Sequence, residues 1–470
     1  MRRKATTLGL VIAAILLAAS TSLAHAKLVS STPLAGATLT TSPTSISLEF
    51  SVRVQSRMSS IAVTDQSGAS IIVGKLVESD QGKLISVPLP EILAGSYRVD
   101  WRALSADDHM IDGNFEFSVG EASQMIPTGS ADVDHSGMDH SAHESAPSIN
   151  WPQSLIRWLI YIGMMLLTGG LGFRLFVLGS VNARTETLDA RLIGIFAAAG
   201  LLAISGLLAA LVLQTQMVTG SFGTSQAMSV LRETSFGPPW LLQICGATVA
   251  FVLLILASAR NTIRRKIALW SAFGLSLAAL LGPSLSGHAR AAWDEYSLAI
   301  LSDWLHLVAG SMWIGGLGVI AFAIAEALRD TDRLAAQASL SAIIKQFTNI
   351  AIPATVLLAI TGLYNTWIHV EGPSALVGTT YGLVLLAKVA ISGVMIVLGG
   401  INTFLLRPRL VAESGALADA GETRLFSSVR FEMLLAIIVL LLAAILAFLP
   451  PAREHKPISA SKEPGVQEAR

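Results

Sequence analysis

Eight apolar stretches, each of roughly 20 residues or more, follow one another between Trp151 and Pro450. A helix of about 20 residues spans the hydrocarbon core of a bilayer, because each residue adds about 1.5 Å to its length. The stretches are Pro152–Leu178, Leu192–Leu213, Trp240–Ala257, Ile267–Leu285, Leu298–Ile324, Phe347–Trp367, Tyr381–Leu406 and Phe431–Leu449. We therefore predict an all-α polytopic membrane bundle of about eight transmembrane helices over residues 151–450, followed by a C-terminal tail at residues 451–470.

Basic residues between the predicted spans indicate which side of the membrane each connection faces. Thirteen lie in alternate connections: Arg184, Arg191, Arg260, Arg264, Arg265, Lys266, Arg329, Arg333, Lys345, Arg407, Arg409, Arg424 and Arg430. The intervening connections carry only Arg232 and Arg290. By the positive-inside rule the first group is cytoplasmic. We therefore expect a multi-pass protein of the cytoplasmic (inner) membrane, with its N-terminal domain and C-terminal tail on the periplasmic or extracellular side.

The first 24 residues, 1–24, have the pattern of a secretory signal peptide. A basic start at residues 2–4 precedes the apolar run Leu8–Ala19 and the small-x-small site that ends at Ala24. Cleavage there makes His25 the first residue of the mature chain. A second small-x-small site, two residues later, would leave Lys27 first instead.

Residues 25–120 differ in pattern from the rest of the chain. Short alternating or β-branched segments, such as Ser45–Phe50 and Tyr97–Leu104, are separated by turns rich in Pro, Gly, Ser and Asp. This pattern is typical of a small all-β sandwich or barrel.

Two parts of this predicted β domain carry groups that bind metal. An N-terminal histidine at position 25 would offer its α-amino nitrogen and ring Nδ1 to one ion, a chelate that suits Cu(II). Asp107 and His109 are two residues apart, so in an extended segment they project to the same face. A polar turn between strands is the alternative interpretation of Asp107 and His109. The sole cysteine, Cys245, lies in an apolar run, so a metal site of the Cys-x-x-Cys type is excluded.

Residues 121–150 form a linker rich in His, Met and Asp. Little in this stretch can be buried, so we expect it to be flexible. His135, Met138, His140 and His143 are candidate weak metal sites within it. A solvated tether without metal is the alternative.

Ionisable residues gather at the outer end of the predicted bundle. Asp303 and His306 share a helical face with Gly310 and Trp313 at the start of the fifth span. His288 and His369 are expected at the same level, and Lys388 lies seven residues, about 10 Å of helix, inside Tyr381 on the seventh span. Charged groups at this depth usually face a bundle interior or a wet cavity. We interpret His288, Asp303, His306 and His369 as a metal path and Lys388 as a charge partner of Asp303; a hydrogen bond between helices is the alternative role of His306.

The motifs resemble two copper protein families. Residues 25–119 resemble CopC, a periplasmic copper-binding family, through His25–Pro33, Ser105–His109 and Phe115–Val119. Residues 151–450 resemble its membrane companion CopD through Ser286–Ala289, Asp303–His306 with Trp313–Leu317, and Tyr381-Gly382 with Lys388. The resemblance implies a cupredoxin-like (Ig-like) sandwich that binds Cu(II) through His25, Asp107 and His109. CopC more often has glycine where this chain has Asp108. Met58 and Met110 are the only methionines in the domain, so we expect no Cu(I) site of clustered thioethers.

The combined interpretation is a copper import protein: the β domain captures Cu(II) and hands it to the bundle. The expected partners are copper ion and the lipid membrane, with a periplasmic copper donor or reductase as candidates; the zero net charge suggests no nucleic acid. We expect no enzymatic activity, and the chain has no phosphate-binding loop. Two alternatives stay open. One is copper sequestration for resistance, with the membrane part as anchor or sensor, and the other is a copper or haem redox enzyme.

Overall fold

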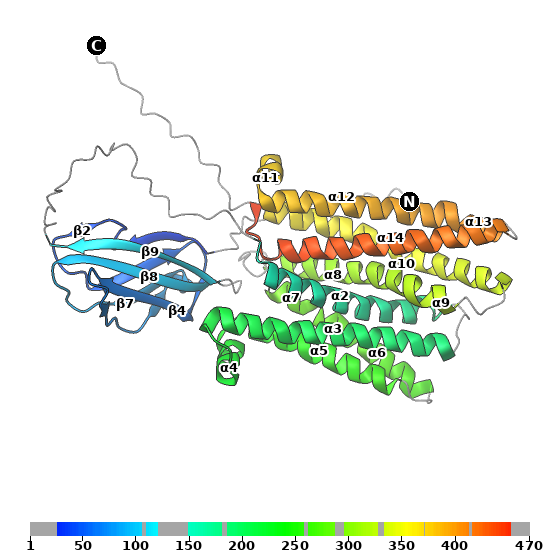
Figure 1. Ribbon diagram of the computed structural model, residues 1–470, viewed down its shortest axis with the longest axis horizontal. Coiled ribbons are helices and arrows are strands. Elements are labelled where there is room, and N and C mark those ends of the chain that lie inside the picture. The colour runs from blue at the N-terminus through cyan, green and yellow to red at the C-terminus, as the bar shows by residue number, and fades with distance from the viewer. Residues whose placement is uncertain are drawn as a thin grey trace, which may run out of the picture.

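The computed structural model describes residues 26–105, 110–120, 149–180, 186–257, 262–286, 296–327, 333–370, 372–412 and 416–452. They form a β domain and a helical domain, and the β domain lies at one end of the helices (Figure 1). Several predicted metal ligands are outside the described residues: His25, Asp107, His109, His288 and the four linker residues His135, Met138, His140 and His143.

The β domain is a sandwich of two sheets. One sheet has the order β1 (Leu28–Thr32), β3 (Ser45–Phe50), β7 (Leu84–Pro88), β6 (Val77–Ser79). The other has the order β2 (Thr38–Leu39), β9 (Met110–Val119), β8 (Gly95–Ser105), β4 (Val54–Asp65), β5 (Ser70–Ile71). All pairings are antiparallel except β2 with β9. The predicted all-β sandwich is confirmed.

The core of the sandwich follows from the alternation along its strands. In β3, Ile46, Leu48 and Phe50 are buried while the residues between them are not. This period of two sends one face of the strand into the core. Across the core, the ring of Phe50 meets that of Trp101 edge to face, with centroids 5.4 Å apart.

The helical domain contains, among its described residues, eight helices long and apolar enough to cross a membrane, as predicted. The helices and the π-helical segments that continue three of them are α2 (Trp151–Gly172) with η2 (Phe173–Val177), α3 (Glu186–Thr219), α4 (Thr224–Glu233), α5 (Gly237–Leu256), α6 (Thr262–Ala279), α7 (Leu281–Ser286), α8 (Tyr296–Val319) with η4 (Ile320–Ile324) and α9 (Ala325–Ala327), α10 (Arg333–His369), α11 (Pro373–Gly378), α12 (Thr380–Ile401) with η5 (Asn402–Leu406) and α13 (Arg407–Ala412), and α14 (Ala416–Leu446).

Two helices begin well before the apolar stretches that predicted them. α10 begins at Arg333 rather than near Phe347, and α14 begins at Ala416 rather than near Phe431. Their first turns mix charged and polar residues with Ala and Leu, so hydropathy marks only the part of each helix that is apolar enough for a bilayer. One consequence is that Glu432 lies inside α14, whereas the apolar stretch placed it at the start of a span.

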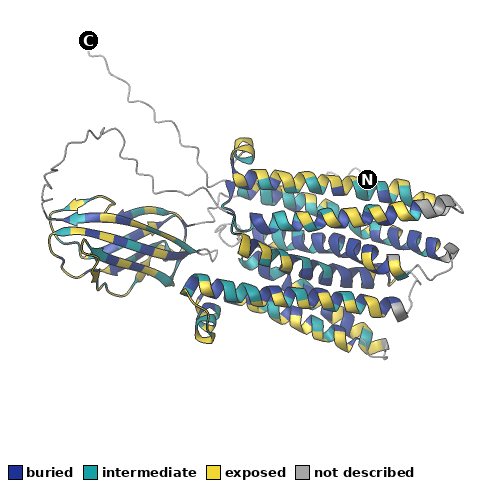
Figure 2. Ribbon diagram, in the orientation of Figure 1, coloured by how far each residue is buried: buried dark blue, intermediate teal, exposed yellow. Residues whose placement is uncertain are grey.

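Helices α2 and α8 form the centre of the bundle, and α12 lies at its edge, as the burial colours show (Figure 2). α2 and α8 approach closely where Gly169 faces Ser311 and Gly315. A Cβ added at Gly169 would lie 1.7 Å from the Ser311 carbonyl oxygen, so only glycine fits there. Small residues at helix contacts allow such close packing inside a membrane.

Candidate functional site

Three helices bring the predicted membrane residues together at the outer end of the bundle. Asp303 and His306 lie near the start of α8, His369 ends α10, and Lys388 is in the third turn of α12. The Asp303 carboxylate is within electrostatic reach of His369 and Lys388. Among the described residues, no nitrogen–oxygen contact within 4.0 Å joins Lys388 to Asp303, so the two side chains do not form a direct ion pair. We call Asp303, His306, His369 and Lys388 the outer cluster.

Hydrogen bonding sets the tautomer of His306. Its Nδ1 lies 2.9 Å from the hydroxyl oxygen of Thr361 on α10. The Thr361 hydroxyl donates its own hydrogen to the carbonyl of Leu357, 2.7 Å away. The Thr361 oxygen must therefore accept from His306, so Nδ1 carries the hydrogen and Nε2 carries the lone pair. A metal-binding histidine uses this arrangement, in which one ring nitrogen donates to a fixed acceptor and the other faces the ion.

His369 has a different acceptor for its Nδ1. This nitrogen lies 2.6 Å from the backbone carbonyl oxygen of Asn365, one turn earlier on α10. A carbonyl can only accept, so Nδ1 donates. The ring also stacks on Tyr381 of α12, with centroids 6.4 Å apart. The alternative role of His306, a hydrogen bond between helices, is present, since its bond to Thr361 joins α8 to α10.

The sequence did not single out Arg157 and Tyr161, which extend the outer cluster onto α2. The charge of Arg157 acts on Asp303 and on Tyr161, and Tyr161 also interacts with Asp303. The Arg157 guanidinium lies over the Phe448 ring, 4.6 Å from its centroid, a cation–π contact. An arginine four residues before a tyrosine in the first turns of a span was the available signal, since such a pair shares one helical face.

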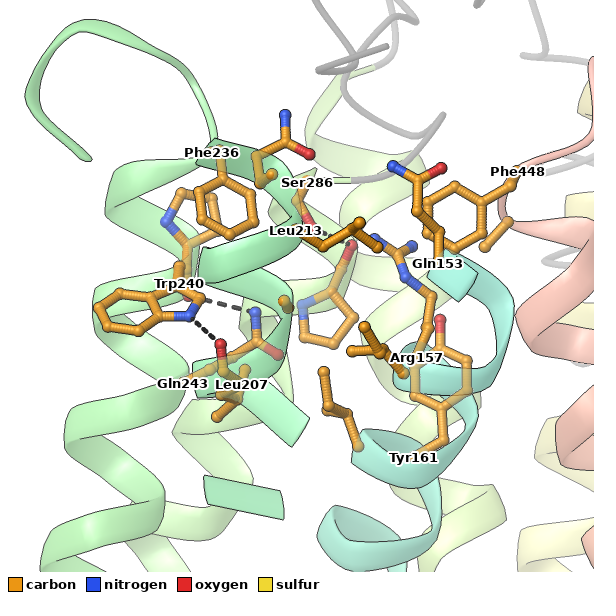
Figure 3. A pocket seen from close by; sticks show the side chains of 17 residues that line it. Gln153, Arg157, Tyr161, Leu207, Leu213, Phe236, Trp240, Gln243, Ser286 and Phe448 are labelled. Atoms are coloured by element: carbon orange, nitrogen blue, oxygen red, sulfur yellow. Dashed lines mark hydrogen bonds between the residues drawn. The ribbon is translucent and has the colours of Figure 1, made fainter. Parts of the chain in front are cut away.

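A cavity of about 80 Å³ opens beside Arg157 and Tyr161. Figure 3 shows its lining, in which the polar groups Gln153, Arg157, Gln243 and Ser286 face apolar walls that include Phe236 and Trp240. Trp240 Nε1 donates to the Leu207 carbonyl at 2.7 Å and so holds α5 against α3. The cavity is large enough for a few water molecules and offers them several polar partners.

The β domain docks on the bundle next to this cavity. Gln55 Nε2 donates to Ser235 Oγ at 2.8 Å, and the Ser235 backbone N–H donates to Gln55 Oε1 at 2.9 Å. Leu104 of β8 is fully buried in an apolar cluster with Val218 and Val230 of the helical domain. Phe236, which lines the cavity, packs against the same cluster.

The described flanks of the predicted Cu(II) ligands lie at this docked end of the sandwich. The last cross-strand pair of β8 and β9 is Leu104 with Met110, one on each side of residues 105–109. Met110 packs against the apolar cluster that Leu104 forms with Val218 and Val230. The Ser105 carbonyl accepts a hydrogen bond from Gln55 at 2.8 Å. Ala26, which follows His25, is 4% exposed and belongs to the core of the sandwich. Lys27, the next residue, donates its backbone N–H to Ser51 Oγ at 2.9 Å, just before the start of β4.

Within the described part of the chain, no three His, Cys, Asp or Glu side chains lie close enough together to hold a metal ion. Asp303, His306 and His369 are therefore neighbours without forming one closed site.

Comparison with known families assigns three parts of the chain. Residues 28–120 match the CopC domain, residues 148–298 match the copper resistance protein D-like N-terminal domain, and residues 341–446 match copper resistance protein D.

Three relatives together cover both domains. The chain is 28% identical to the copper transport protein CutJ of Bacillus subtilis over 453 residues, 93% of this chain and 76% of that protein. It is 27% identical to copper resistance protein D of Pseudomonas syringae pv. tomato over 313 residues, 64% of this chain and 96% of that protein. It is 34% identical to copper resistance protein C of Escherichia coli over 109 residues, 22% of this chain and 86% of that protein.

Proposed function

The chain belongs to the copper resistance and transport family in which a CopC domain is joined to a CopD membrane domain, and we propose that it imports copper across the cytoplasmic membrane. In this proposal Cu(II) is the cargo. The β domain captures it outside the membrane, and the outer cluster receives it. The name of the relative CutJ, a copper transport protein, agrees with transport as the task of the fused chain.

The observation that carries the proposal is the docking of the β domain. Leu104, at one flank of residues 106–109, is buried against Val218 and Val230 of the helical domain, and Phe236, which packs against the same cluster, also lines the cavity. The cavity is lined by Arg157 and Tyr161, which interact with Asp303. A Cu(II) site built by His25, Asp107 and His109 would therefore lie at the end of the β domain that docks beside this cavity, and Arg157 and Tyr161 connect the cavity to the outer cluster.

The chemistry of the outer cluster fits an ion in transit. His306 directs a lone pair from Nε2, and imidazole nitrogen is a good ligand for copper. The Asp303 carboxylate adds one negative charge. In the absence of copper, Lys388 and Arg157 partly balance this charge, and an arriving cation would take over that role.

Processing before His25 is part of the proposal. The N-terminal chelate needs a free α-amine on His25, so cleavage must follow Ala24. The burial of Ala26 in the β core supports this cut, because cleavage after Ala26 would remove a core residue.

Copper accumulation in sealed proteoliposomes tests the transport step. Asp303→Asn and His306→Ala should abolish uptake while Cu(II) binding by the β domain stays as in the unchanged protein. Asp100→Asn is a matched control for Asp303→Asn, since Asp100 pairs with Arg98 on the surface of the β domain at 3.0 Å. Normal uptake in both membrane variants would leave the bundle as an anchor, and copper sequestration would then be the better description.

The soluble Cu(II) site has a separate test. His109→Ala should strongly weaken Cu(II) binding, whereas Asp108→Gly should have little effect, because the proposal assigns ligand roles to His25, Asp107 and His109 and none to Asp108. Binding can be followed by the weak d–d absorption of Cu(II). Equal losses in the two variants would show that the ligands are assigned incorrectly.

A further inference from the structure

A second polar pair lies inside the bundle, away from the outer cluster. It consists of Glu432 on α14, 1% exposed, and Asn402, the first residue of η5, 5% exposed. Asn402 Nδ2 donates a hydrogen bond to Glu432 Oε1. Asn402 follows Lys388 by fourteen residues on the same helix, about 21 Å along its axis, toward the end that the basic loops mark as cytoplasmic.

Three polar atoms at this pair have no hydrogen-bond partner among the described residues. They are Glu432 Oε2, Asn402 Oδ1 and Ser428 Oγ, all buried. Ser428 precedes Glu432 by four residues, so the two share one face of α14. Buried polar atoms are nearly always hydrogen-bonded, so three orphaned atoms on neighbouring side chains need an explanation.

No cation forms an ion pair with Glu432 among the described residues. The basic groups on the elements around it are directed elsewhere. Arg174 pairs with Asp189, Arg407 donates to the Ser341 carbonyl, Lys388 and Arg157 belong with Asp303, and Lys345, Arg409, Arg424 and Arg430 are exposed. Of the acidic groups, Glu326 pairs with Arg191, and Glu422 lies near the start of α14. An ionised carboxylate without a counter-charge at this depth is costly.

The backbone at the pair is also irregular. η5 begins at Asn402 and η4 continues α8, and both pack against α14. A π-helical segment shifts the register of the backbone hydrogen bonds, and such segments are frequent at functional sites.

We propose that Glu432 and Asn402 form a proton-binding site that exchanges its proton for a cation during transport. With the proton on Oε2, the carboxyl group is neutral and can donate to Asn402 Oδ1, so one proton removes the charge and pairs two orphaned atoms. When the proton passes to water, Oε2 becomes an anionic ligand for the passing Cu(II), so a divalent ion replaces one proton and the site gains one positive charge. The exchange of this proton for a cation depends on the proposed copper import, whereas the binding of a proton by Glu432 does not.

Infrared spectroscopy of the purified full-length protein tests the proton itself. The C=O stretch of a protonated carboxyl group should be present at neutral pH, and Glu432→Gln should remove it. Glutamine has nearly the same shape and can still pair with Asn402, so this variant should fold. The control Glu422→Gln makes the same chemical change near the start of the same helix and should keep the band. An unchanged band in Glu432→Gln overturns the proposal.

Copper uptake into liposomes under an imposed pH gradient tests the exchange. Uptake by the unchanged protein and by Glu422→Gln should depend on the gradient, whereas uptake by Glu432→Gln should not. Equal dependence in Glu432→Gln overturns the exchange role. If the unchanged protein takes up no copper but loses the infrared band on Glu432→Gln, the proposed import fails and the proton site stands.

Discussion

Gln55 and Ser235, 180 residues apart, form a two-point hydrogen bond that joins the β domain to the bundle. Gln55→Ala removes both bonds and should weaken docking by about 1–2 kcal/mol. The undocked fraction should then rise roughly five- to thirty-fold. Hydrogen exchange at the Ser235 amide measures this directly, because that N–H is protected by Gln55. Gln66→Ala, in an exposed turn of the β domain, is the control; equal exchange in the two variants would contradict the docking contact.

The acceptor of His306 gives a second prediction. Thr361→Val removes the hydroxyl that accepts from Nδ1, so the ring is no longer held in one tautomer, and copper uptake should fall roughly 10- to 100-fold. Thr361→Ser keeps the hydroxyl and should keep most of the activity. Nitrogen NMR of His306 separates this role from a purely structural one. The hydrogen should be on Nδ1 in the unchanged protein and be shared between the two nitrogens in Thr361→Val.

The sequence predicted the spans and the outer cluster because both depend on simple periodicities. Hydropathy over about 20 residues identifies a helix that crosses a bilayer, and a spacing of three or four places Asp303 and His306 on one face. The position of His369 at the same end of the bundle follows from the alternating orientation of the spans. Because these features are local or topological, they need no knowledge of side-chain packing.

Other features depend on packing and have no such pattern. Arg157 reaches Asp303 only because α2 lies at the centre of the bundle beside α8. The apolar stretch begins at Phe431 and places Glu432 at the start of a span, where a charge is common. In the structure α14 begins at Ala416, so Glu432 lies well inside the helix. The π-helical turn at Asn402 is a shift in backbone hydrogen bonding that no residue type marks on its own.

The proposed N-terminal chelate predicts a specific mature end. The purified protein should begin at His25, and one extra residue before it should lower Cu(II) affinity by orders of magnitude, because the α-amine would become an amide. Affinity should also fall as the pH drops below the range in which histidine is neutral, since protons compete for the nitrogen ligands. N-terminal sequencing that begins at Lys27 would rule the chelate out.

The contact between α2 and α8 predicts a strong effect of one methyl group. Gly169→Ala would place Cβ 1.7 Å from the Ser311 carbonyl oxygen, so the two helices must separate. We expect destabilisation of about 1–3 kcal/mol, as for other overpacked sites. Gly274→Ala in α6 is the control, since an added Cβ there meets nothing within 4 Å. Equal melting temperatures for the two variants in detergent would show that α2 and α8 do not pack this closely.

The charges of Asp303 and Lys388 predict a compensating pair of substitutions. The two charges attract each other without a direct ion pair. Removing one of them therefore leaves the other in the membrane with less opposite charge nearby. Asp303→Asn and Lys388→Met should each lower the melting temperature, and the double variant should lower it less than the sum of the two. Copper uptake should not recover in the double variant, because neutral Asn and Met do not restore the carboxylate that receives the cation. Additive losses of stability would show that Lys388 does not balance Asp303, and Arg157 would then be the group that does.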